Sequence, residues 1–598
     1  NINLSPTQQA TQPASFAENT YEAVDTVTKV FGRHALRFGG EYTREQNNDN
    51  QIGQSRPAYA FATPWNFVNN APIFEGVNVN PTSGAFSTGQ FYYRSYDFGL
   101  FVQDDIKVTP NFTANLGLRY EFFSPISEAN NKLTNLFPTS DPTLGLVNAS
   151  VKPVSEYYRP TKRAFSPRLG FAWSPGTHSN MVIRAGFGIA YDRVPEALLT
   201  PSRQNPPFAA NFGLCCGTAP TEFGKPFDNG LILLSTSSTG ITGYTVSPQI
   251  TTQMPLGPNN LPTGAAGPCC GSISIWGAPQ YFPQPMAMLY SLDVQDRLPW
   301  RLIGTVGYQG SQTRHEIRII NENFIYAKVN PAVNAAFFPT PDVTGNFNAL
   351  LANLQRNFGG WQFGANYRWS RSMDELSYSG PGFVTNQTYP QNNLLNYGPS
   401  DYDAKHYANF STVYEVPWFK HTSGIANELL SGWQISGIYT FHTGFPWTPV
   451  TFQSCLPVAS QCLSPYRPSG ILQAPVYSSS FHALTTPGVN FPGSCGGTKV
   501  QSCGALYFNQ APGLPIIGRN SFRGPNYRSV DAAVGKAFHI TEHSSIDLRA
   551  IAYNVFNLTN LQPFQFGSSN TNIGDPNFGL SPGSTAGRVL QLQARLRF

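Results

Sequence analysis

The sequence predicts an all-β protein, a transmembrane antiparallel up-and-down β-barrel with long extracellular loops. Three observations lead to this fold class. Apolar and polar residues alternate along many segments of about ten to fourteen residues. The links between these segments are alternately short and long. The composition combines only 12% charged residues with 14% aromatic residues, 54 Gly and 50 Pro, which suits many strands joined by turn-rich loops.

The alternation is simplest in the last residues, RVLQLQARLRF, because successive side chains of a strand point to opposite faces. Strands of soluble sheets are usually about five or six residues long, whereas about 9 to 11 tilted residues cross a bilayer. The segment length therefore favours a membrane barrel over the alternative, a soluble β-sandwich with an aromatic core. In the last segment the apolar face would comprise Leu590, Leu592, Ala594, Leu596 and Phe598.

Fifteen segments carry the pattern. We predict strands at residues 20–30, 33–42, 91–107, 112–123, 164–173, 181–191, 286–297, 301–309, 346–357, 361–370, 406–416, 432–442, 527–538, 545–558 and 588–598.

Short links alternate with long ones along this series. Links such as 108–111 and 359–360 are short, 417–431 is somewhat longer, and 192–285 and 443–526 are long. Short turns on one rim and long loops on the other are typical of outer-membrane barrels, whose short side is periplasmic. We therefore expect a cell outer-membrane location, with the long loops extracellular and the C-terminus periplasmic.

The strand count leads to an expectation about the ends of the chain. Bacterial single-chain barrels have an even number of strands, and the last strand here would run towards the periplasm. An odd count then places residue 1 in an outer loop. We expect residues 1–19 to be a truncated outer loop and residues 20–598 to be the C-terminal portion of a longer barrel. The first twenty residues lack the features of a signal peptide, and no apolar run is long enough for a transmembrane helix.

The charge pattern argues against nucleic acid as a partner. The formal net charge is only +5 over 598 residues, and the basic residues are scattered singly instead of forming a block that could follow a phosphate backbone.

The eight cysteines all fall in two of the predicted long loops and none in a predicted strand. An even number of cysteines in an oxidising compartment predicts disulfides that staple the loops. Because adjacent cysteines rarely bond to each other, the two vicinal pairs would cross-link. The alternative is a four-thiolate metal site, although the spacing is not that of a zinc ribbon. The candidates are Cys215, Cys216, Cys269, Cys270, Cys455, Cys462, Cys495 and Cys503.

Several sequence segments resemble segments of one protein family, and they occur in the same order along the chain. FGRHALRFGGEY, FGLFVQDDIKVTPNFTANLGLRYEFFSP, SPRLGFAWSP, MVIRAGFGIAYDR, SDYDAKHYANFSTVYEVPW and LLSGWQISGIYTFHTGFPW are similar to the barrel of Oar-like TonB-dependent receptors, which carry an N-terminal carboxypeptidase-regulatory-like domain. The resemblance runs from about Tyr21 to Phe598 and leaves out the loops.

This resemblance implies further parts and partners. Full receptors of the family have about 22 strands, a plug domain in the lumen and a segment that contacts the TonB energy-transducing complex. The terminal strand resembles the signal that the barrel assembly machinery recognises, with Phe598 preceded by alternating apolar residues. We expect this strand to pair with the first strand and close the barrel, because an open edge cannot face lipid.

We expect the protein to be a transporter in the outer-membrane lipid that takes up a small-molecule or peptide ligand, such as an oligosaccharide, a peptide or a metal chelate. A passive porin or a structural, adhesive barrel is the alternative. No nucleophile motif, dinucleotide fingerprint or P-loop is visible, so we expect neither an enzyme nor a cofactor. The aromatic loops FATPWNFVNN and SIWGAPQYFPQP could stack on a ligand or anchor the loops to the barrel.

Other polar residues receive structural interpretations. We assign SDYDAKH, with Asp401, Asp403 and His406, to a rim turn that leads into a strand, and His539 and His543 to a solvated periplasmic turn. Inward-facing arginines are expected to pair with carboxylates on neighbouring strands or with the plug. These are Arg119, Arg184, Arg368, Arg549, Arg595 and Arg597, with Glu121 and Asp547 among their expected partners.

Overall fold

The structure of the chain is a computed structural model. It describes residues 2–4, 15–50, 58–61, 74–138 except 86 and 88, 146–215 except 177–179, 256–263, 273–322, 333–377 except 358, 392–450 except 420–423, 517–564 except 542, and 581–598. Short segments between 467 and 509 and between 570 and 579 are also described.

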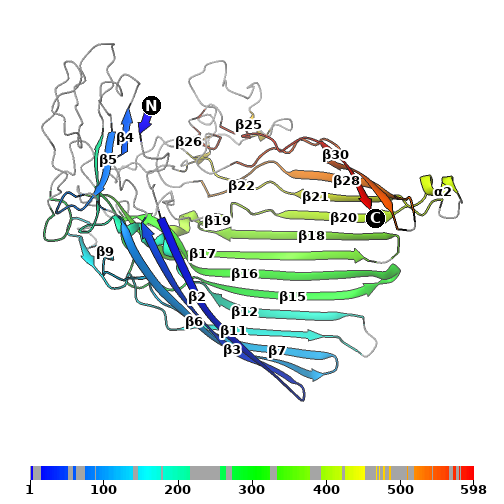
Figure 1. The fold of residues 1–598 in the computed structure, drawn as a ribbon, viewed down its shortest axis with the longest axis horizontal. Coiled ribbons are helices and arrows are strands. Elements are labelled where there is room, and N and C mark those ends of the chain that lie inside the picture. Colours follow the sequence, from blue (N-terminus) through cyan, green and yellow to red (C-terminus); the bar gives the residue numbers. More distant parts are fainter. Residues whose placement is uncertain are drawn as a thin grey trace, which may run out of the picture.

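One curved, predominantly antiparallel sheet of eighteen strands dominates the structure (Figure 1). Three of its strands are short: β8 (Ser127–Glu128), β14 (Ile273–Trp276) and β19 (Gly398–Pro399). The other fifteen correspond one to one with the fifteen predicted segments. They are β2 (Ser15–Phe31), β3 (His34–Asn50), β6 (Gln90–Thr109), β7 (Phe112–Phe123), β11 (Ala164–Trp173), β12 (Val182–Tyr191), β15 (Met286–Leu298), β16 (Leu302–Asn321), β17 (Val333–Arg356), β18 (Trp361–Asp374), β20 (His406–Glu415), β21 (Gln434–His442), β28 (Tyr527–His539), β29 (Ser545–Tyr553) and β30 (Val589–Arg597).

Each long strand pairs with the next long strand in the chain, which is the up-and-down order that was predicted. The pairing of β2 with β3, for example, starts at Phe31 and His34 beside the turn and continues to Ser15 and Asn50. Short links lie at one end of the sheet and long links at the other (Figure 1).

The side chains alternate between the two faces as expected. On β7, Leu116 lies on the outer face with 46% of its surface exposed, whereas Arg119 and Glu121 lie on the inner face. On β30, Leu592 is 86% exposed. Within the described residues, no second sheet and no helix covers these outer apolar faces. A row of exposed apolar side chains along fifteen strands is unfavourable in water and favourable in lipid, so the outer face is a lipid-contacting surface.

Buried apolar residues gather instead at the long-link end of the sheet. One core cluster joins loop residues such as Leu146 and Leu261 to the outer ends of β16 and β17. A second includes Phe91, Tyr157 and Phe282, and a third forms around Trp447. The conventional hydrophobic cores of this protein therefore stabilise the loops, while the wall of the sheet is stabilised by strand pairing.

Small secondary elements build these loops. A four-stranded sheet contains β1 (Ile2–Leu4), β4 (Ala58–Phe61), β5 (Phe74–Val79) and β13 (Ala210–Cys215). Two-stranded sheets pair β9 (Thr134–Phe137) with β10 (Ser150–Pro153), β22 (Pro446–Trp447) with β27 (Phe522–Arg523), β23 (Gly470–Ile471) with β26 (Phe508–Asn509), and β24 (Val476–Tyr477) with β25 (Leu484–Thr485). Among the described residues the helices are η1 (Glu196–Leu198), η2 (Thr200–Gln204), η3 (Pro299–Arg301), η5 (Asn393–Asn396) and α2 (Ile425–Leu430). No helix in the described part of the chain is both long and apolar enough to cross a membrane.

Several strands extend beyond their predicted bounds at the long-link end. β2 begins at Ser15 instead of residue 20, and β3 continues to Asn50 instead of ending at residue 42. β16 continues to Asn321, and β17 already begins at Val333. These extensions include polar runs such as TREQNNDN, in which the apolar alternation ends but backbone pairing continues. The alternation of apolar and polar residues therefore located the lipid-facing part of each strand. It missed the part that extends beyond the lipid at the long-link end.

β30 and β2 do not pair with each other in this chain, so the expected pairing of the last strand with the first strand of a longer barrel stays a prediction. β30 pairs with β29 and β2 pairs with β3, and these two strands form the margins of the sheet. A sheet closes only when strand number, tilt and register stagger agree. In the described part of this chain the fifteen long strands leave both margins of the sheet unpaired.

Candidate functional site

The inner face of the sheet carries polar and charged residues that interact across strands. Arg119 of β7 binds Glu121 on its own strand, with Nε 2.9 Å from the carboxylate, and also binds Glu41 on β3. To reach Glu41, the guanidinium crosses β6 at Gly99, where a Cβ atom would lie only 2.5 Å from an Arg119 nitrogen. The glycine thus permits one arginine to link three strands on the inner wall.

A second ionic group lies above it at the long-link rim. Arg193, which follows β12, is 2.5 Å from Glu45 and 3.5 Å from Asp97, and it donates a 2.9 Å hydrogen bond to the Ser95 hydroxyl. Ser95 donates to Glu196 of η1 at 3.0 Å. Burial raises the pKa of Glu196, and the hydrogen bond from Ser95 and the charge of Arg193 only partly offset that rise. The group fastens the start of the 192–285 link onto β3 and β6.

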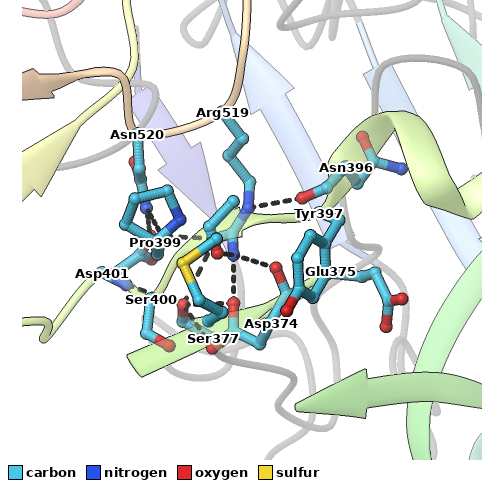
Figure 2. Close-up of polar contacts among 12 residues, drawn as sticks. Asp374, Glu375, Ser377, Asn396, Tyr397, Pro399, Ser400, Asp401, Arg519 and Asn520 are labelled. Atoms are coloured by element: carbon cyan, nitrogen blue, oxygen red, sulfur yellow. Dashed lines mark hydrogen bonds and ion pairs between the residues drawn. The ribbon is translucent and has the colours of Figure 1, made fainter. Parts of the chain in front are cut away.

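A third polar group joins the loops beside β18, β20 and β28. Figure 2 shows Arg519 placed between Asp374, at the end of β18, and the segment that follows η5. Its guanidinium binds the Asp374 carboxylate, donates to the Asp374 carbonyl at 2.7 Å and to the Asn396 carbonyl at 2.8 Å, and lies 3.2 Å from Asp401. We call Arg519 and the groups that it binds the Arg519 clamp.

Neighbouring residues extend the Arg519 clamp. The Asn520 amide donates to Asp401 at 2.6 Å and to the Pro399 carbonyl at 2.7 Å (Figure 2). Arg523 binds Asp403, whose side chain is only 2% exposed and also accepts a 2.7 Å hydrogen bond from the backbone N–H of Ser372. Three loops are thereby held at one point of the rim.

The clamp confirms part of the interpretation of SDYDAKH. Asp401 and Asp403 lie in a rim turn, and His406 is the first residue of β20, 2.7 Å from the Tyr367 hydroxyl. Their partners Arg519 and Arg523 were not among the residues predicted from the sequence. The signal available was the RNSFR motif, which places two arginines directly before a strand, but no local pattern says which carboxylates they meet.

A cavity of about 290 Å³ opens on the inner wall next to the Arg519 clamp. Ser311, Thr313 and Glu316 of β16 line one side, and Asp374 and Ser377 line the other. Within the described residues, the side chains of Ser311, Thr313 and Glu316 make no hydrogen bond to another protein group. The cavity therefore offers free acceptors and hydroxyls to a ligand that carries hydroxyl or amine donors. A larger cavity of about 690 Å³ lies on the inner wall among β17, β18, β20, β21, β28 and β29.

The predicted ionic pairs are partly confirmed. Arg119 pairs with Glu121, and Arg597 lies 2.6 Å from Asp547. Arg184 instead donates to Gln295 at 2.9 Å, and Arg368 lies 5.3 Å above the centre of the Tyr407 ring. Arg549 contacts the Ser436 hydroxyl at 3.3 Å.

The two histidines at 539 and 543 lie at a short link, as predicted. The backbone N–H of His539 donates to Glu428 at 2.9 Å. Among the described residues, no three His, Cys, Asp or Glu side chains are placed to hold a metal ion.

The aromatic loop SIWGAPQYFPQP is anchored in the loop core. Trp276 packs on Phe337 with ring centres 4.8 Å apart, and Phe282 is fully buried against Tyr158. Tyr281 remains exposed and available to a ligand. In FATPWNFVNN, all residues after Phe61 lie outside the described residues.

The cysteine predictions fall almost entirely outside the described residues. Only the backbone of Cys215 is described, and it ends β13, paired with Phe74 of β5. The expectation that no cysteine lies in a strand is therefore wrong for Cys215, because the long loops form their own sheet. The disulfides remain a prediction for Cys215, Cys216, Cys269, Cys270, Cys455, Cys462, Cys495 and Cys503.

The terminal strand presents its apolar residues on the outer face. Leu592, Ala594 and Leu596 pair with Ala550, Leu548 and Ile546 of β29, and Phe598 is almost fully exposed. Their role as an assembly signal remains a prediction.

The chain is similar to known outer-membrane proteins in family and in fold. A family model described as "Outer membrane beta barrel domain" matches residues 1–591. A search of curated proteins found no match. Similar solved structures include the outer membrane transporter YddB from Escherichia coli, with 10% identity, TM-score 0.48, and coverage of 98% of this chain and 55% of that one.

Two further structures show the same degree of similarity. The FrpB iron transporter from Neisseria meningitidis has 10% identity and TM-score 0.45, with 98% and 55% coverage. The siderophore receptor PiuA from Acinetobacter baumannii has 11% identity and TM-score 0.43, with 98% and 56% coverage. The chain spans a little over half the length of these solved chains.

Proposed function

Because the chain belongs to the outer membrane beta barrel domain family and is an outer-membrane protein, we propose that it forms the wall of a ligand-gated transporter that uses energy from TonB. The observation that carries this proposal is the contrast between the two faces of one sheet. The outer face is apolar and uncovered, and the inner face carries ionic groups and cavities beneath clamped loops.

The proposed orientation rests on the difference between the two rims. The long links lie outside the cell and the short links lie in the periplasm, together with the C-terminus. The alternation of link lengths supports this orientation, and so does the concentration of folded loop structure at one end of the sheet (Figure 1). A ligand would meet the long-link rim first.

The ligand is an oligosaccharide, a peptide or a metal chelate. The free acceptors of the 290 Å³ cavity favour ligands with several hydroxyl or amine donors, because each buried acceptor that gains a donor avoids a desolvation cost. A plug domain in the lumen would close the path until TonB pulls on it, as the resemblance to Oar-like receptors implies. Energy coupling distinguishes this function from a passive pore.

Uptake in cells tests the proposal. Cells that express the complete gene should accumulate the cognate ligand from a panel of labelled oligosaccharides, peptides and metal chelates. Accumulation should fall to background when tonB is deleted. Accumulation that is independent of TonB, together with steady conductance of the purified protein in planar bilayers, would instead support the passive porin. No accumulation of any ligand and no conductance would support a structural or adhesive barrel.

A further inference from the structure

The link between β20 and β21 carries the helix α2 at the end of the sheet where the short links lie (Figure 1). At 100° per residue, Ile425, Leu429 and Leu430 share one side of α2, and Asn427 and Glu428 share the other, to which the C-cap residue Ser431 also belongs. The helix is therefore amphipathic even though it has only six residues.

The apolar side of α2 is the exposed side. Ile425 is 78% exposed, Leu429 is 53% exposed and Leu430 is 46% exposed. A helix on the surface of a soluble protein has the opposite arrangement, with apolar residues inward and polar residues in water. Nearby Trp418 is also largely exposed.

The polar side of α2 is fastened to β28. Glu428 accepts a 2.9 Å hydrogen bond from the backbone N–H of His539. Lys536 donates to the carbonyl of Ser431, the C-cap residue, where the negative end of the helix dipole favours a cation. These contacts hold the polar side against the rim and leave the apolar side facing away.

The fastening places α2 next to the lipid-facing wall. Lys536 lies two residues after Val534 on β28, so the two side chains share a face, and it pairs with Leu548 of β29. Val534 and Leu548 are both exposed on the outer face. The stem of Lys536 is buried, and its ammonium lies 6.0 Å from the ring centre of Trp433 and 5.1 Å from that of Phe538. A lysine that covers apolar surface with its stem and sends its charge towards the membrane boundary is a common interfacial arrangement.

We propose that α2 is an interfacial anchor whose apolar side inserts into the phospholipid leaflet at the short-link rim. Phospholipid is the occupant because the apolar side continues the outer apolar face of β21, β28 and β29 beyond the end of the strands. Amphipathic helices of this kind lie at the boundary of headgroups and acyl chains. The anchor fixes the depth of the barrel in that leaflet independently of ligand uptake.

Site-specific fluorescence in vesicles tests this anchor. A small fluorescent amino acid is introduced at Leu429, and the complete protein is reconstituted into phosphatidylethanolamine and phosphatidylglycerol vesicles with or without dibrominated acyl chains. Brominated lipid should quench the emission at least twofold, and aqueous acrylamide should quench it weakly. The matched control is the same fluorophore at His543, an exposed residue of the neighbouring short link, which should show the reverse pattern.

Each other outcome overturns the proposal. Quenching of the Leu429 reporter by acrylamide alone would place α2 in water. Quenching by neither agent would mean that protein covers the apolar side. Resistance of the folded barrel to SDS before heating shows whether each variant has assembled, and a reporter at Ile425 replaces one at Leu429 that does not assemble.

Discussion

Arg119 on β7 reaches across Gly99 of β6 and binds Glu41 on β3, so that one side chain spans three strands of the inner wall. The crossing requires a residue without a Cβ at position 99. Gly117, which is also on the inner wall, has no such role, since a Cβ there would lie 3.5 Å or more from every neighbouring atom.

Gly99→Ala should therefore destabilise the barrel by about 1 kcal/mol, because the added methyl group displaces Arg119 from Glu41. The measurement is the temperature at which the purified barrel loses its resistance to SDS. Gly117→Ala is the matched control and should leave this temperature unchanged. In a Glu41→Gln background the effect of Gly99→Ala should largely disappear, and full additivity of the two substitutions would contradict the crossing.

The Arg519 clamp should be sensitive to loss of guanidinium geometry. In Arg519→Lys the ammonium keeps the charge but cannot bind Asp374, Asn396 and Asp401 at the same time. We expect the free energy of unfolding to fall by about 2–4 kcal/mol. Hydrogen exchange in residues 396–403 should accelerate about tenfold or more. Arg528→Lys, on an exposed residue of the same region, should not change it. Equal exchange in both variants would show that the clamp does not hold the loops.

Glu322 should make the stability of the fold dependent on pH. Burial raises the pKa of its carboxyl to about 7 from the usual 4.5, and the charge of Arg318 offsets only part of this rise. Because the folded pKa is raised, protonated Glu322 stabilises the fold below pH about 4.5, and that stability is lost as the pH rises through 7.

The expected loss is up to about 3 kcal/mol at pH 8. Glu322→Gln should remove this dependence and be more stable than the wild type at pH 8 but not at pH 4. Chemical denaturation at the two pH values measures the difference. Identical pH profiles of the two proteins would mean that Glu322 is hydrated in the folded state.

Phe598 should matter for assembly more than for the stability of the finished barrel. Its ring is almost fully exposed, so few protein contacts are lost in Phe598→Ser. We expect this variant to reach the outer membrane several times more slowly in a pulse-chase experiment, whereas Phe598→Tyr should assemble normally. Normal assembly of Phe598→Ser would refute the terminal signal.

The loop cysteines should be oxidised in the mature protein. Proteolytic digestion without reductant, followed by mass spectrometry, should yield cross-linked peptides from the 192–285 and 443–526 links. A cross-link between the pair at Cys215 and Cys216 and the pair at Cys269 and Cys270 is the most specific expectation. Detection of eight free thiols would rule out the disulfides.

The sequence by itself determined the strands and the faces of the wall. A period of two is a local property, so Leu116 and Arg119 fall on opposite sides whatever the rest of the chain does. Lipid on one side and a polar lumen on the other preserve that pattern over whole strands. Where strands project beyond the lipid, as in TREQNNDN, both sides become polar and the sequence no longer marks the end of the strand.

Only the tertiary structure decided which distant groups meet. Asp374 and Arg519 are 145 residues apart, and their contact depends on how three loops fold over the rim. The crossing at Gly99 required the strand register, and the outward side of α2 required its attachment to Lys536. Polar partners and helix orientation are set by geometry that many residues share, and for that reason no local pattern in the sequence specifies them.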